Sequence, residues 1–68
     1  MNGAEFIRRV RRLGRKRNIA ATLESARGKG GHQTLRFGDR LTVVKSGEIG
    51  KGLLRAMCRQ LDIDPDEL

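Results

Sequence analysis

The sequence predicts a mixed α+β domain with the order helix, three strands, helix, in which both helices cover one face of a three-stranded antiparallel sheet. Three observations indicate this fold. Apolar residues recur at helical spacing near both ends of the chain, the middle alternates with a period of two, and glycine-containing turns separate the alternating stretches. The chain of 68 residues is expected to form one small domain, residues 1–68.

The first helix is expected over residues 2–14. Asn2 can cap it, with Glu5 three residues further on, and Gly14 can end it in the left-handed conformation. An apolar stripe and a basic face lie on opposite sides of this segment. The stripe contains Phe6, Ile7, Val10 and Leu13, and the basic face contains Arg8, Arg11, Arg12 and Arg15. A solvated helix face and a phosphate-binding face both explain these arginines, so both interpretations stay open.

Three strands are expected in the middle of the chain, over residues 19–26, 32–37 and 41–45. The alternation points one set of side chains toward the helices and the other set toward solvent. The inward set is Ile19, Ala21, Leu23, Leu35, Phe37, Leu41 and Val43, and the outward set includes Thr22, Glu24, His32, Thr34 and Arg36.

The length of the turn between the second and third strands decides which of their residues pair across the sheet. A two-residue Gly-Asp turn would set Phe37 opposite Arg40 and mix the two faces. A three-residue loop over residues 38–40 would pair Phe37 with Leu41 and Leu35 with Val43. We expect the longer loop, because it keeps the apolar residues of both strands on one face.

The last helix is expected from about Gly50 to Asp62, with Asp64 as the cap and Pro65 as the first residue of a final helical turn. Its apolar stripe is Leu53, Leu54, Met57 and Leu61, with Cys58 beside it. Met57 and Cys58 are expected to be core residues without a chemical role.

The charge balance indicates a polyanionic partner, most simply nucleic acid. Fifteen Lys and Arg oppose eight Asp and Glu, which gives a net charge of +7. Phe6 and Phe37 are the only aromatic residues, so a base-stacking platform is not expected and the partner should be held by its backbone. No segment predicts a signal peptide, a membrane span or a membrane-surface helix.

Cysteine and histidine usage excludes further classes of site. The single Cys58 cannot form an internal disulfide and fits a cytoplasmic protein. With His32 as the only histidine, no zinc site is expected, and we expect no metal and no cofactor.

His32 is the candidate catalytic residue, because it follows the glycine-rich stretch "RGKGG". A neutral imidazole can accept a proton near pH 7. Gly28, Gly30 and Gly31 would let backbone N–H groups approach a phosphate, and Lys29 would add charge. A base beside an anion site is what ribose-assisted RNA cleavage requires. The pattern alone leaves open that His32 is an incidental polar residue after a turn.

The chain resembles a known family in the segments "EFIRRVRRLG", "GKGGH" and "GKGLLRAMCRQLDI", which together cover nearly all of the sequence. The order of elements is that of a double-stranded-RNA-binding domain. More narrowly, the chain is similar to the HicA toxins, bacterial mRNA interferases that HicB antitoxins hold inactive. The resemblance implies an endoribonuclease whose catalytic histidine is His32. It also implies a HicB-like antitoxin partner.

The candidate RNA-binding residues are Arg27, Gly28, Lys29, Gly30, Gly31, Arg36 and Lys51. The sequence departs from the family pattern in three places. Gly31 stands where the family usually has Ser, and Arg15-Lys16-Arg17 follow Gly14 where an aromatic residue is usual. The stretch "VVKSGE" lacks the Pro and second His that often follow the third strand, which leaves the general acid unassigned.

Two other functions remain open. A non-catalytic RNA-binding module of the same fold would use Lys45, Lys51 and the start of the last helix to contact phosphates, and His32 would contact ribose or water. A basic adaptor for another protein is the third possibility, although the pattern predicts no exposed apolar patch. For the nuclease, we expect an acidic antitoxin that covers His32 and residues 27–31 and competes with RNA.

Overall fold

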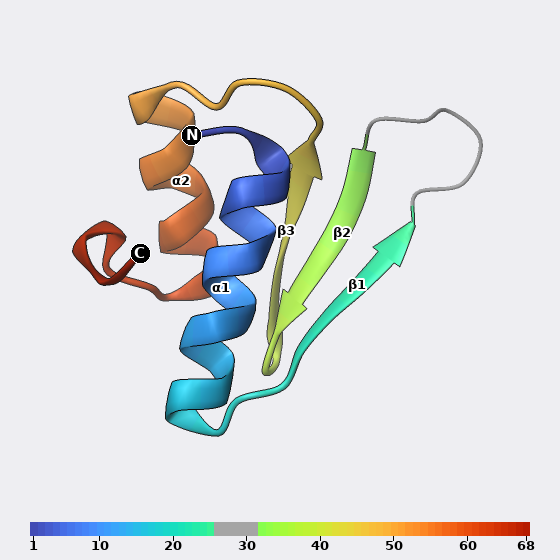
Figure 1. The fold of residues 1–68 in the computed structure, drawn as a ribbon, viewed down its shortest axis with the longest axis vertical. Helices are drawn as coiled ribbons and strands as arrows, with labels where there is room; N and C mark the ends of the chain where they lie inside the picture. Colours follow the sequence, from blue (N-terminus) through green and yellow to red (C-terminus); the bar gives the residue numbers. More distant parts are fainter. Residues whose placement is uncertain (26–31) are drawn as a thin grey trace.

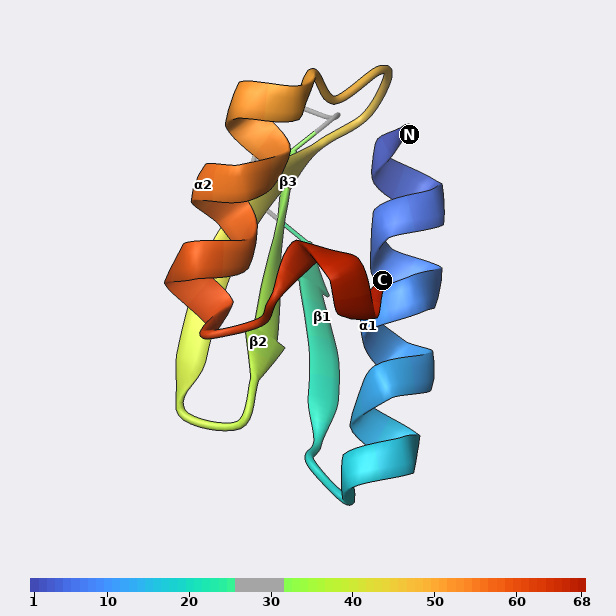
Figure 2. The same cartoon turned by 90° about the vertical axis from the view of Figure 1, so that its left-hand side faces the viewer.

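The computed structural model describes residues 1–25 and 32–68, and it confirms the predicted order of elements. The three strands form one antiparallel sheet in the order β1-β2-β3. Both helices lie on the same face of this sheet, and its other face is open (Figures 1 and 2). The elements are α1 (Gly3–Arg17), β1 (Ala21–Ser25), β2 (His32–Phe37), β3 (Arg40–Lys45), α2 (Lys51–Leu61) and a short 3₁₀ helix η1 (Pro65–Glu67).

The core lies between the two helices and the covered face of the sheet. The predicted stripe of α1 supplies Phe6, Val10 and Leu13 to it, and the inward residues of β2 supply Leu35 and Phe37. β1 also follows its predicted alternation, since its inward residues pack against this core while Thr22 and Glu24 are exposed. The parity within each of these two strands was therefore predicted correctly.

The start of α1 is as predicted, but its end is not. The Oδ1 atom of Asn2 accepts a hydrogen bond from the Glu5 N–H at 2.8 Å, which confirms the cap. The helix runs past Gly14 to Arg17, and Asn18 takes the left-handed conformation with φ of 60°. The N–H of Ile19 then donates to the Gly14 carbonyl at 2.8 Å, as in a Schellman motif.

Gly14 is needed inside the helix because the chain returns close to it. A Cβ atom at Gly14 would lie 2.6 Å from the carbonyl oxygen of Ile19 and 3.4 Å from the Cβ of Ala21. Gly14 therefore allows the contact between α1 and the start of β1, and the left-handed turn is provided by Asn18 instead.

Replacing Gly14 with alanine should destabilise the domain by about 1–3 kcal/mol, although alanine is the better helix former, because the new Cβ would press on backbone. The same change at Gly52 in α2 is the matched control. A Cβ there meets nothing within 4 Å among the described residues, so Gly52→Ala should stabilise by up to about 1 kcal/mol. Urea unfolding measures both changes, and two changes of the same sign would contradict the close approach at Gly14.

The turn between β2 and β3 differs from the prediction. It is the two-residue turn Gly38-Asp39, which sets Phe37 opposite Arg40, Leu35 opposite Thr42 and Arg36 opposite Leu41. Gly38 has a φ of 66°, which suits the first position of a type II′ turn, a turn whose twist matches that of the strands. The expected pairs Phe37–Leu41 and Leu35–Val43 are therefore wrong.

The shorter turn reverses the faces of β3. Thr42 and Val44 are each 2% exposed, whereas Leu41 and Val43, expected inside, are 45% and 52% exposed on the open face. The buried Thr42 is tolerated because its hydroxyl donates to the Oε1 atom of Gln60 on α2.

The predicted stripe of α2 needs one correction. Met57, Cys58 and Leu61 are buried, but Leu53 is 44% exposed, so the buried side is centred nearer to Cys58 than expected. The helix ends at Asp62 in the left-handed conformation, and the Asp64 cap before Pro65 is confirmed by a 3.0 Å hydrogen bond from the Asp66 N–H.

Candidate functional site

His32 is the first residue of β2, and it is exposed on the open face of the sheet, as the sequence predicted. Its cross-strand partner on β3 is Lys45, which is also exposed. Along an antiparallel pair of strands joined by a two-residue turn, hydrogen-bonded and non-hydrogen-bonded residue pairs alternate, starting with a hydrogen-bonded pair next to the turn. His32 and Lys45 therefore form a non-hydrogen-bonded pair, the kind in which the two side chains start closest together. The sheet therefore places Lys45 directly opposite His32 on the open face.

Lys45 was expected only as a phosphate contact of the RNA-binding module, and the expected register did not place it opposite His32. With a three-residue loop, residues 41, 43 and 45 would all face the helices. The two-residue turn moves Lys45 to the open face, opposite His32. The dipeptide Gly38-Asp39 was the available signal, because Gly followed by Asp is one of the short sequences typical of two-residue hairpin turns.

Arg36 shares the open face with His32 but stands four residues further along β2. At the rise of a strand this is about 13 Å, too far for both side chains to act on one phosphate. Arg36 pairs with Leu41, and its other neighbour is Thr22 on β1. Arg36 is thus placed to contact a second point on a long ligand.

The open face also holds a carboxylate and two aliphatic side chains. Glu24 on β1 pairs with Thr34, which in turn pairs with Val43. Leu41 and Val43 are two residues apart on the same strand and face, so they form a small exposed apolar patch. The expectation that no exposed apolar patch exists was therefore wrong, for the same reason as the register.

Lys51 is exposed at the first position of α2, after the N-cap residue Gly50, which makes no side-chain capping bond. The first turn of α2 lies at the same end of the molecule as the start of β2 (Figure 1). α2 covers the other face of the sheet, however, so the structure does not bring Lys51 onto the open face with His32. The candidate residues Arg27, Gly28, Lys29, Gly30 and Gly31 lie outside the described residues.

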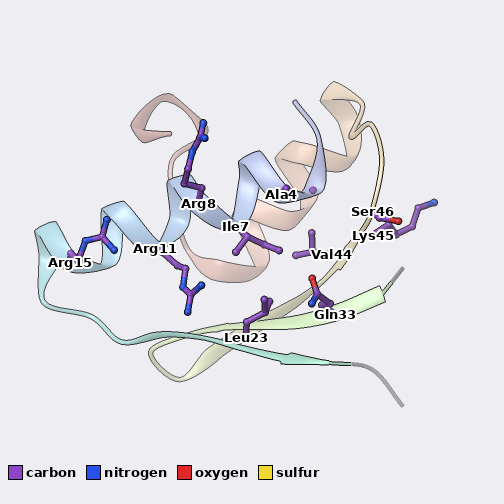
Figure 3. A pocket seen from close by; sticks show the side chains of 11 residues that line it. Ala4, Ile7, Arg8, Arg11, Arg15, Leu23, Gln33, Val44, Lys45 and Ser46 are labelled. Atoms are coloured by element: carbon purple, nitrogen blue, oxygen red, sulfur yellow. The ribbon is translucent and has the colours of Figure 1, made fainter. Parts of the chain in front are cut away.

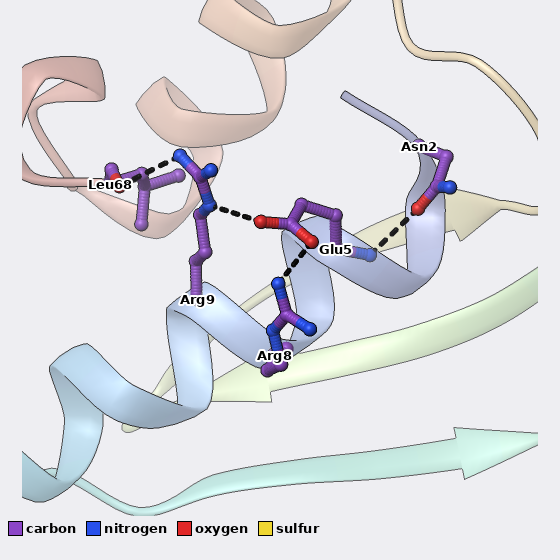
Figure 4. Close-up of polar contacts among 5 residues, drawn as sticks. All are labelled: Asn2, Glu5, Arg8, Arg9 and Leu68. Atoms are coloured by element: carbon purple, nitrogen blue, oxygen red, sulfur yellow. Dashed lines mark hydrogen bonds and ion pairs between the residues drawn. The ribbon is translucent and has the colours of Figure 1, made fainter.

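The basic face of α1 is partly neutralised at its first turns (Figure 4). The Glu5 carboxylate accepts from Arg8 and, at 2.7 Å, from the Nε of Arg9, whose guanidinium also donates to the Leu68 carbonyl at 3.0 Å. The bonds from Arg9 and then Arg8 lower the pKa of Glu5. The ionised Glu5 side chain therefore contributes stability at pH values above the pKa that Glu5 has in the unfolded chain. This contribution is lost as the pH falls through the lowered pKa of Glu5 in the folded protein.

The later arginines of α1 carry unbalanced charge. Within residues 1–25 and 32–68, ion pairs join Arg8 and Arg9 to Glu5, and Arg17 to Glu67. Arg11, Arg12 and Arg15 form none with those residues, and all three are exposed. This part of the helix has the electrostatic character of an anion-binding surface.

Cys58 is not a candidate nucleophile. It is fully buried, and burial, followed by the nearby charge of Asp64, raises the pKa of its thiol, which opposes formation of the reactive thiolate. Across the described parts of the chain, no three His, Cys, Asp or Glu side chains are grouped so that they could hold a metal ion.

The protein is thus a small basic α-β-β-β-α domain with an exposed histidine at one end of an open sheet face. Comparison with protein-family models, with curated proteins and with solved structures finds no match for this chain. No helix in the described ranges is long and apolar enough to cross a membrane.

Proposed function

We propose that the protein is a metal-independent endoribonuclease of the HicA type, an mRNA interferase toxin that acts in the cytoplasm. The observation that carries this proposal is the exposed His32 with Lys45 directly opposite it on an open sheet face. A base and a cation side by side, reachable by a long ligand, are the minimum that ribose-assisted cleavage needs.

In the proposed reaction, the imidazole of His32 takes the proton of a ribose 2′-OH. The oxygen so formed attacks the adjacent phosphorus, the bond to the 5′-oxygen of the next nucleotide breaks, and that oxygen leaves with a proton. Lys45 stabilises the charge that develops on the phosphoryl oxygens. The residue that protonates the leaving oxygen is unassigned. The open face supplies Arg36 for a neighbouring phosphate of the same strand.

The alternative is a non-catalytic RNA-binding module. The exposed arginines in the second half of α1 favour it, since a helix face of this charge can bind a phosphate backbone without any chemistry. The two functions differ only in what His32 does. For the nuclease we further propose a HicB-like acidic antitoxin as partner, which would cover His32 and exclude RNA from the open face.

The chemistry of the products tests the nuclease proposal. Cleavage should give 2′,3′-cyclic phosphate and 5′-OH ends and should persist in EDTA, because the attacking group is the ribose hydroxyl and no metal-activated water takes part. An otherwise identical oligonucleotide with 2′-deoxyribose is the matched control, and it should compete for binding but remain intact. Products with 5′-phosphate ends, cleavage of the deoxy oligonucleotide, or complete loss of cleavage with the chelator would overturn the mechanism.

A further inference from the structure

A groove lies between α1 and the sheet because the helix crosses the strands at an angle. Near its C-terminal end, α1 touches the start of β1, where Gly14 admits the Ile19 carbonyl. At its N-terminal end the helix touches β3 instead, since a Cβ at Gly3 would overlap the carbonyl oxygen of Lys45. Between these two contacts the helix stands away from the second half of β1, and a groove of about 660 Å³ opens there.

The floor of the groove is aliphatic (Figure 3). Ile7 projects into it from α1, and Leu23 projects toward the helix from β1. Both were expected to be core residues, yet both remain half-buried. Gln33 and Ser46 add polar side chains on the sheet side, and Val44 closes the inner end. The floor is thus an apolar surface that the domain itself covers only in part.

The rim of the groove is basic. Arg8, Arg11 and Arg15 line it from α1 and Lys45 from the end of β3, and no Asp or Glu does so among the described residues. Arg8 is paired with Glu5 and points away from the sheet, whereas Arg11 points from the helix toward β1 (Figure 3). Arg11 and Arg15 form no ion pair within the described ranges. A ligand of this groove should therefore combine aliphatic groups with negative charge.

The chain's own C-terminal residues show how such a ligand is held on α1. On another side of the same helix, Glu67 pairs with Arg17 and the Leu68 carbonyl accepts from Arg9 at 3.0 Å. Leu68 also packs against the core cluster. An acidic stretch with an aliphatic residue is thus already bound to arginines of α1. The groove has the same combination of charge and apolar surface, and among the described residues that line it none is aromatic and able to stack on a nucleobase.

We propose that this groove is a docking site for an acidic segment of a partner protein, in which aliphatic side chains occupy the floor at Ile7 and Leu23 and carboxylates pair with Arg11 and Arg15. The site lies on the covered side of the sheet, whereas His32 faces the open side. Lys45 borders the groove, but none of the residues proposed to contact the partner belongs to the proposed nuclease site. Failure of either proposal leaves the other standing.

The test uses the full chain and a fluorescein-labelled peptide of about twelve residues with leucines at helical spacing and glutamates elsewhere. Fluorescence anisotropy should show saturable binding to the wild type. Arg11→Glu should weaken binding by about tenfold or more, because it removes the pair between Arg11 and a peptide carboxylate, which the bound peptide partly shields from water. Arg12→Glu is the matched control, because it makes the same charge change on the same helix outside the groove, and it should weaken binding by less than about threefold.

Two further measurements separate the groove from general charge attraction. A peptide with serines in place of the leucines should lose most of its affinity, and amide NMR shifts on adding the leucine peptide should be largest at Leu23 and Gln33. Equal losses for the two arginine variants, equal binding of the serine peptide, or no binding at all would overturn the proposal. An RNA oligonucleotide that shifts the same amides more strongly, or a wild type that dimerises through the groove, would also overturn it.

Discussion

Replacing His32 with alanine is expected to slow RNA cleavage by about 10²–10⁴-fold, the usual effect of losing a general acid–base group. RNA affinity should hardly change, since the phosphates are held by lysines and arginines. Single-turnover cleavage and a separate binding assay measure the two quantities. Expression of the wild type should also be toxic to a bacterial host, and expression of His32→Ala should be harmless.

Two further variants on the same sheet face serve as controls for the cleavage rate of His32→Ala. Thr34→Ala removes a neighbouring side chain that does not ionise at neutral pH and so cannot act as a general base, and it should leave the cleavage rate within about threefold of wild type. Lys45→Ala removes the cation opposite His32, so it should lower the cleavage rate, and RNA binding should become less dependent on salt. A His32→Ala protein that cleaves as fast as wild type would leave the RNA-binding module as the function.

The position of His32 could be predicted from sequence, whereas that of Lys45 could not. Side chains within one strand alternate with a period of two, so the apolar Leu35 and Phe37 fix His32 on the opposite face whatever the strand pairs with. The partner across the sheet depends on the length of the turn. One residue more or fewer between β2 and β3 moves every side chain of β3 to the other face.

The apolar pattern of β3 could not settle the turn length because both choices bury aliphatic residues. One face of the strand carries Leu41 and Val43, and the other carries Thr42 and Val44. By composition alone the first face is the more apolar. The second is the face that the two-residue turn buries, and Gln60, 18 residues away on α2, supplies a partner for the Thr42 hydroxyl. A contact at that separation in the chain is not visible in a strand pattern.

The end of α1 was mispredicted for a similar reason. Glycine is both the usual residue of a left-handed helix end and the residue that admits a close backbone neighbour. At Gly14 the second use applies, because the chain turns at Asn18 and brings Ile19 back against the helix. Asn tolerates the left-handed conformation well enough to end the helix one turn later. Sequence alone shows both residues but not which of them the returning chain touches.

The register can be tested by one substitution made at two positions. Leu35→Ala is expected to destabilise the domain by about 2–5 kcal/mol, because Leu35 is fully buried and its loss leaves a cavity in the core. A domain of this size rarely has more than about 3–5 kcal/mol of total stability, so the variant should be largely unfolded at 37 °C. Circular dichroism with urea unfolding measures the change.

Leu41→Ala is the matched control, since the same side chain is shortened on the neighbouring strand. Leu41 is 45% exposed, so its truncation should cost less than about 1 kcal/mol. With the three-residue loop, Leu41 would be a core residue opposite Phe37, and the two variants would lose similar stability. Comparable losses would therefore contradict the Gly38-Asp39 turn, and they would also move Lys45 away from His32. A large loss at Leu35 with a small loss at Leu41 is the result that keeps Lys45 opposite His32 on the open face.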